Sequence, residues 1–87
     1  AAAAAHAGLN DAFYQLRKNA RWNKGFNEKP LEDDCYTVTV SGGPEGLLVV
    51  STGCTAQNYR ARIKALACIE GSAAPYSIRV KRVWMNE

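Results

Sequence analysis

The sequence has 87 residues, a formal net charge of +3 and 47% hydrophobic residues, which is the size and composition of one small globular domain. This composition excludes a disordered chain, which would contain fewer hydrophobic residues and more net charge. Because eight acidic residues offset eleven Lys and Arg, the charge alone does not require a nucleic acid as partner.

The first segment of the chain, residues 1–21, predicts an amphipathic helix. Apolar residues recur there at spacings of three and four, at Ala5, Leu9, Ala12, Phe13, Leu16 and Ala20. Polar residues take the other side. We expect Leu9, Phe13 and Leu16 to form the face that packs against the rest of the domain.

The next segment, "NARWNKGFNEKP", breaks the helical period with Asn, Gly and Pro, and it predicts a loop over residues 22–34. We expect Trp22 and Phe26 in this loop to fold back onto the core. The alternative is that they are exposed for recognition of a partner.

From residue 35 the pattern has a period of two, which predicts strands. "CYTVTV" alternates apolar residues with threonine, and "SGGPEG" predicts a hairpin turn that Pro44 helps to close. "LLVVSTG" has the continuous apolar start of a central strand. Two later segments, "NYRARIKALACI" and "YSIRVKRVW", alternate as well, although the alanines of the first would also suit a helix. The predicted fold is therefore α+β: one N-terminal helix packed on a four-stranded antiparallel meander that spans residues 35–87.

The basic residues of the last two predicted strands occupy alternate positions and therefore share one face. They are Arg60, Arg62, Lys64, Arg79 and Lys81. This pattern is typical of a solvated face of the sheet, and a face for an anionic partner is the alternative.

The sequence contains no motif for catalysis, a metal or a cofactor, so we expect a protein that is not an enzyme. The three cysteines lack the paired spacing of a zinc site. His6, the single histidine, lies in the alanine-rich start, away from a candidate cysteine nucleophile. Asp33 and Asp34 are adjacent and point apart on an extended chain, which makes them a poor acid/base pair.

The spacing of the cysteines leaves a disulfide and three reduced thiols equally open. In an up-and-down meander, however, only Cys35 and Cys54 meet, because the hairpin brings the start of its first strand beside the end of its second. This disulfide would close a loop of about 20 residues and stabilise the domain by roughly 3 kcal/mol. Cys68 would then stay reduced, buried beneath the helix.

The order of these motifs resembles the type IV pilin superfamily, particularly the small PilX-type minor pilins and related pseudopilins. The resemblance rests on "AGLNDAFYQLRKN", "YTVTVSGG", "LLVVSTG" and "YRARIKA", and it covers residues 5 to about 66. His6 departs from the pattern, because the family usually has glutamate before "AGL".

The resemblance implies a non-enzymatic structural subunit of a type IV pilus or related filament. Such a subunit assembles with other pilin subunits through its N-terminal helix and leaves its sheet exposed. Its further partners would be other minor subunits, a host surface in cell adhesion, or DNA. The implied location is the inner membrane and periplasm before assembly, and the cell surface or an extracellular filament afterwards. The five initial alanines would then belong to the distal half of a longer helix, and the membrane contact would come from an apolar segment upstream.

Two other classes remain as alternatives. The first is a small basic α+β module that binds nucleic acid, with Tyr59 or Tyr76 as stacking platforms. Against it, the predicted strands place these aromatic residues opposite the cations. The second is a secreted inhibitor or toxin with a disulfide, which the cysteines and the Gly-Pro turn favour.

Overall fold

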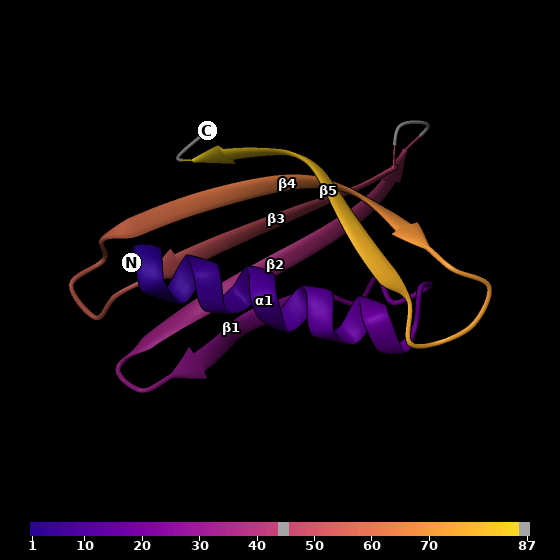
Figure 1. The fold of residues 1–87 in the computed structure, drawn as a ribbon. Coiled ribbons are helices and arrows are strands. Elements are labelled where there is room, and N and C mark those ends of the chain that lie inside the picture. The colour runs from indigo at the N-terminus through magenta and orange to yellow at the C-terminus, as the bar shows by residue number, and fades with distance from the viewer. Residues whose placement is uncertain (44–45, 86–87) are drawn as a thin grey trace.

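The computed structural model describes residues 1–43 and 46–85. Its elements are, in chain order, α1 (Ala2–Lys18), β1 (Phe26–Leu31), β2 (Asp34–Gly43), β3 (Gly46–Cys54), β4 (Arg60–Glu70) and β5 (Ser77–Met85). The strands form one antiparallel meander in the order β1-β2-β3-β4-β5, and α1 lies along one face of the sheet (Figure 1). The predicted α+β class, with an N-terminal helix on an antiparallel meander, is confirmed.

The prediction of four strands is wrong, because part of the predicted loop forms β1 at the edge of the sheet. The register of β1 with β2 shifts between Phe26 and Lys29, and every side chain of β1 after Phe26 is exposed. No alternation of apolar and polar residues therefore marks this strand in the sequence. Pro30 is tolerated because an edge strand leaves one of its sides without ladder hydrogen bonds.

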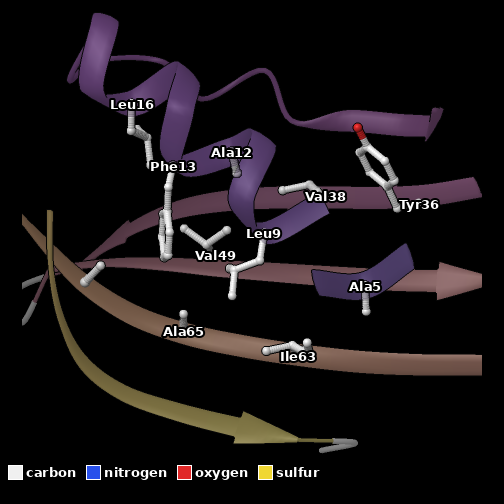
Figure 2. Packing of buried hydrophobic residues seen from close by; sticks show 11 residues of the cluster. Ala5, Leu9, Ala12, Phe13, Leu16, Tyr36, Val38, Val49, Ile63 and Ala65 are labelled. Carbon is white, nitrogen blue, oxygen red and sulfur yellow. The ribbon is translucent and has the colours of Figure 1, made fainter. Parts of the chain in front are cut away.

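The helix α1 has an alanine-rich sequence that favours helix formation, and it ends where Asn19 adopts an extended backbone. Arg17 and Lys18 lie in its last turn, where positive charge interacts favourably with the helix dipole. Its buried stripe consists of Ala4, Ala5, Gly8, Leu9, Ala12, Phe13 and Leu16. The three residues predicted to form the packing face are all part of this stripe and of the hydrophobic core (Figure 2).

The strands β2 to β5 follow the predicted segments. Gly43 pairs with Gly46 at the β2–β3 hairpin, and Pro44, which we expected to help close the turn, lies outside the described residues. The segment that also suited a helix is the strand β4, and it buries Ile63, Ala65 and Ala67 completely against α1 and the neighbouring strands.

The helix approaches β3 closely because small residues face each other there. A Cβ atom added to Gly8 would overlap the Ser51 hydroxyl and come within 2.8 Å of Cδ1 of Tyr36, and one added to Gly53 would overlap the backbone of Ala5. The buried Ser51 hydroxyl donates a hydrogen bond of 2.7 Å to the carbonyl oxygen of Ala5. Helix and sheet are therefore held at a short separation by both packing and a polar contact.

The aromatic residues after α1 fold back as predicted. Trp22 and Phe26 are partly buried against the core, with their ring centroids 5.2 Å apart. Phe26 also meets Tyr36 edge to face, at a centroid distance of 5.8 Å. These contacts close the end of the core that lies between α1 and β1. Within residues 1–43 and 46–85, no helix is long and apolar enough to cross a membrane.

Candidate functional site on the outer face of the sheet

The face of the sheet opposite α1, called the outer face below, consists of the residues that alternate with the buried ones along β2 to β5. On β3, for example, Leu48, Val50 and Thr52 alternate with the buried Val49 and Ser51. The register aligns outer-face residues in rows across the strands. One row is Thr39, Val50, Lys64 and Trp84, and the next is Ser41, Leu48, Leu66 and Arg82.

The strand β4 supplies three cations of the outer face, at Arg60, Arg62 and Lys64. They alternate with the partly buried Ala61 and the buried Ile63, so neighbouring cations recur every two residues, or about 6.8 Å along the strand. Arg60 and Arg62 line a shallow hollow together with Thr52 of β3. Two guanidinium groups beside a hydroxyl are donors that suit phosphate or carboxylate oxygens.

The strand β5 contributes Arg79 and Arg82, and here the structure corrects the prediction. The register with β4 shifts, so that Val80 pairs with Ala67 and Arg82 pairs with Leu66. Lys81, which we expected on the same face as Arg79, is the extra residue of this bulge. It lines a hollow whose other residues include Leu47, Ala67 and Ile69, which belong to the helix side of the sheet. Arg82 takes its place on the outer face.

Within residues 1–43 and 46–85, few acidic residues lie near these cations. Among the described residues, Glu70 at the end of β4 is the acid on this side of the sheet, and its Oε2 lies 3.4 Å from Nε of Arg79. The acids of β1 and of the β1–β2 turn lie at the opposite edge, separated from β4 by β2 and β3. The outer face of β4 and β5 therefore carries five cations and one acid in the part of the chain that the structure describes.

An aromatic side chain that sequence reasoning missed lies among these cations. Trp84 pairs with Lys64 across the strands, and the guanidinium carbon of Arg82 is 5.6 Å from the Trp84 ring centroid. Trp84 also lines a second shallow hollow, with Ser41, Leu48, Leu66 and three glycines. An unbroken period of two along β5 would place Trp84 on the helix side with Ile78 and Val80, but the bulge at Lys81 reverses the alternation after it. The signal in the sequence is the pair of consecutive cations at residues 81–82, which breaks the period of two.

The tyrosines that we considered as stacking platforms do not take part in this arrangement. Tyr59 lies in the turn between β3 and β4 with 70% of its surface exposed. Tyr76 precedes β5 and donates its backbone N–H to the carbonyl oxygen of Arg17, at 2.8 Å, next to the end of α1. Trp84 is thus the aromatic residue that the fold brings to the cations.

The cysteines lie where the meander predicted, with one exception. Cys35 and Cys54 face each other across β2 and β3 with their Cα atoms 5.5 Å apart, and they form a disulfide. The sequence predicted Cys68 beneath the helix, and this is wrong: Cys68 alternates with Ala67 and Ile69, which pack on the helix side, and it is half-buried on the outer face.

Electrostatic coupling between α1 and the sheet is concentrated at Asp11. Its Oδ2 accepts hydrogen bonds from Nζ of Lys29 and from the hydroxyl of Tyr36, at 2.5 and 2.6 Å. Burial raises the pKa of Asp11, whereas these hydrogen bonds and the charge of Lys29 lower it. The lowering effects are larger together, so the pKa of Asp11 lies below its ordinary value. The hydrogen bond to Asp11 raises the pKa of Lys29, and burial together with Asp11 raises that of Tyr36. The cluster joins α1 to β1 and β2.

In the described part of the chain, no group of three or more His, Cys, Asp or Glu side chains is placed to hold a metal ion. No family model, curated protein or solved structure matches this sequence or its fold. The outer face offers guanidinium, ammonium, hydroxyl and indole groups, which together are suited to binding anions.

Proposed function

We propose that this protein is a non-enzymatic structural subunit of a type IV pilus or related filament, of the minor pilin or pseudopilin kind. The proposal starts from the resemblance of the four sequence motifs. The architecture supports it, since a long helix packed along an antiparallel meander is the arrangement that the resemblance implies. Other pilin subunits would be its partners.

The observation that carries the proposal is a second stripe on α1, on the side away from the sheet. Its exposed positions are Ala2, Ala3, His6, Asn10 and Tyr14. No residue from 1 to 10 has a formally charged side chain at pH 7. Asp11 is the first, and Lys29 and Tyr36 bind it on the sheet side. A neighbouring helix can therefore cover this stripe as far as Asn10 without burying a charged side chain. At Tyr14 the stripe meets a cation, because Nζ of Lys18 lies 4.8 Å from the Tyr14 ring centroid.

The location in this proposal is the cell surface or an extracellular filament, reached through the inner membrane and periplasm. The disulfide between Cys35 and Cys54 supports it, because disulfides form and persist in oxidising compartments. The open outer face supports the proposal further, since a subunit that assembles through its helix leaves its sheet available at the filament surface.

The first experiment asks whether the protein is part of a filament. Filaments sheared from the surface of the source cells are purified and probed with antibodies raised against the 87-residue chain. We expect the chain in the filament fraction. Recovery of the chain only in the soluble or cytoplasmic fractions, from cells that make filaments, contradicts the proposal.

The second experiment asks whether the second stripe is the assembly surface. In a Cys68→Ala background, Asn10→Cys places a thiol on the stripe, and Gln57→Cys places one in the exposed turn between β3 and β4 as a matched control. In the isolated chain, we expect a maleimide to label the thiol of either variant. In filaments, we expect it to label the Gln57→Cys variant and not the Asn10→Cys variant. Equal labelling of both positions in filaments shows that α1 is not covered by neighbours.

A further inference from the structure

We propose that the outer face binds single-stranded nucleic acid, with phosphates over the cations of β4 and β5 and a base on Trp84. This inference does not depend on the filament role, because it concerns the side of the sheet that α1 does not touch. Its tests use the chain alone.

The charge distribution favours a linear polyanion. Three cations follow each other along β4, at Arg60, Arg62 and Lys64. Two more continue the series on β5, where Arg82 lies opposite Leu66 and Arg79 opposite Cys68. The spacing of about 6.8 Å between successive cations of a strand provides a row of separate contacts rather than one point charge. Among the described residues, Glu70 is the acid that lies near these cations, where it pairs with Arg79. The electrostatic potential over this face is therefore positive, and it attracts a chain of phosphates.

The position of Trp84 favours nucleic acid over other polyanions. Its indole is in the cross-strand row of Lys64 and next to the guanidinium of Arg82. Beside it, Leu48, Leu66 and Ser41 line a shallow hollow. A base can stack on the indole while its phosphates meet the cations, which is how sequence-tolerant single-strand binding works. An acidic polysaccharide or an anionic lipid would use the cations but has no planar base for the indole.

Binding is measured by fluorescence anisotropy of a short labelled oligothymidylate, titrated with the full 87-residue chain at several salt concentrations. A second readout uses the Trp22→Phe variant, in which Trp84 is the remaining tryptophan, because the chain has two. We expect the affinity to fall steeply with salt and the oligonucleotide to quench the Trp84 fluorescence.

Two variants with equal net charge locate the contact. One carries Arg60→Gln, Lys64→Gln and Arg82→Gln on the outer face. The control carries Lys18→Gln, Arg21→Gln and Lys24→Gln, which are exposed at the end of α1 and in the loop after it. We expect the first variant to reduce the slope of log K against log salt by about 2, since each contact with a single strand contributes about 0.7, and the control to keep the wild-type slope.

Two single substitutions separate stacking from charge and do not depend on the folding of the triple variant. Trp84→Leu should weaken oligothymidylate binding about tenfold without changing the salt slope, because a base loses its stacking surface but no phosphate contact is removed. Arg60→Gln, at an exposed position, should reduce the slope by about 0.7.

Several results would overturn the inference. One is an equal loss of affinity in the two triple variants, which would mean that net charge alone attracts the oligonucleotide. Another is binding without any quenching of Trp84. A third is tighter binding of heparin, or of phosphatidylserine vesicles, than of oligothymidylate at the same salt concentration, which would assign the outer face to one of those partners instead.

Discussion

The hydroxyl oxygen of Tyr36 lies 2.6 Å from Oδ2 of Asp11, and the same carboxylate oxygen accepts a hydrogen bond from Lys29. A single carboxylate on α1 thereby ties together the helix, the edge strand β1 and the strand β2. The edge strand has few other attachments, because its side chains after Phe26 are exposed.

Acid should weaken this link. The pKa of Asp11 is below its ordinary value of 3.8 in the folded protein, so its contribution to the free energy of unfolding is complete above that value and is lost as the pH falls through the lower, folded pKa. Asp11→Asn should therefore lower stability at pH 7, by at most about 1 kcal/mol, and flatten the decline of stability below pH ~4. Denaturant unfolding at a series of pH values measures both effects. Asp33→Asn, in the exposed β1–β2 turn, is the control, and an identical acid profile for both variants would contradict the assignment.

The same cluster should also lose stability in alkali. The pKa values of Lys29 and Tyr36 are raised above their ordinary values of 10.5 and 10.0. Their contributions are therefore complete below those values and are lost as the pH rises through the folded pKa values. We expect Tyr36→Phe, which keeps the ring in the core, to reduce the dependence of unfolding on pH above about 10. An unchanged alkaline profile would show that the hydroxyl is not part of the link.

Phe13 should be a major contributor to stability. Phe13 points from α1 into the core and is 9% exposed. Phe13→Ala should therefore lower the free energy of unfolding by about 3 kcal/mol. Tyr14 is its neighbour on the exposed side, at 55% exposure, and Tyr14→Ala should cost less than about 1 kcal/mol. Chemical denaturation compares the two. Equal, small losses would mean that the apolar stripe of α1 faces solvent.

Gly8→Ala should destabilise the domain although alanine is the better helix former. The substitution gains about 1 kcal/mol of helix propensity, but its methyl group meets the Ser51 hydroxyl and the Tyr36 ring. Overpacking of this kind costs about 1–3 kcal/mol. Adding Ser51→Gly should recover part of the loss, because it removes one of the two obstructions. A Gly8→Ala protein as stable as the wild type would show that helix and sheet separate easily.

The disulfide should be the sole cysteine link and should stabilise the fold. Peptide mapping without reduction should recover Cys35 joined to Cys54, and Cys68 outside that link. Replacing both linked cysteines with serine should lower the free energy of unfolding by roughly 3 kcal/mol, given a sequence separation of 19. Recovery of a Cys54–Cys68 peptide would contradict the strand pairing, since Cys54 pairs with Arg60 at the other end of β4.

The sequence predicted those helices and strands that have one apolar, buried side and one polar, exposed side. The strand β4 buries Ile63 and Ala65 and exposes Arg62, so its alternation distinguished it from a helix. The Cys35–Cys54 link followed from the predicted hairpin, and the pairing of Gly43 with Gly46 gives β2 and β3 the register that brings the two cysteines together. In the same way, the alternate spacing of the three cations of β4 predicted that they share one face of the sheet.

The parts that sequence did not predict depend on irregular backbone. β1 is held on one side only and is exposed almost throughout, so neither hydrophobic period nor strand propensity marked it. On β5, one additional residue at Lys81 exchanges the faces of residues 82–85, and this brought Arg82 and Trp84 to the outer face. A bulge depends on how two strands pair, and a local pattern of residues along one strand does not record that pairing.

The two bulges also bear on aggregation. The meander has two outermost strands, β1 and β5, and unpaired strands at sheet borders are templates for uncontrolled strand addition between molecules. β1 presents a shifted register and Pro30, which has no N–H to offer, and β5 presents its own bulge flanked by Arg79 and Arg82. Neither border offers a long, regular ladder to a second molecule. At high protein concentration, this topology therefore disfavours the growth of continuous intermolecular sheets.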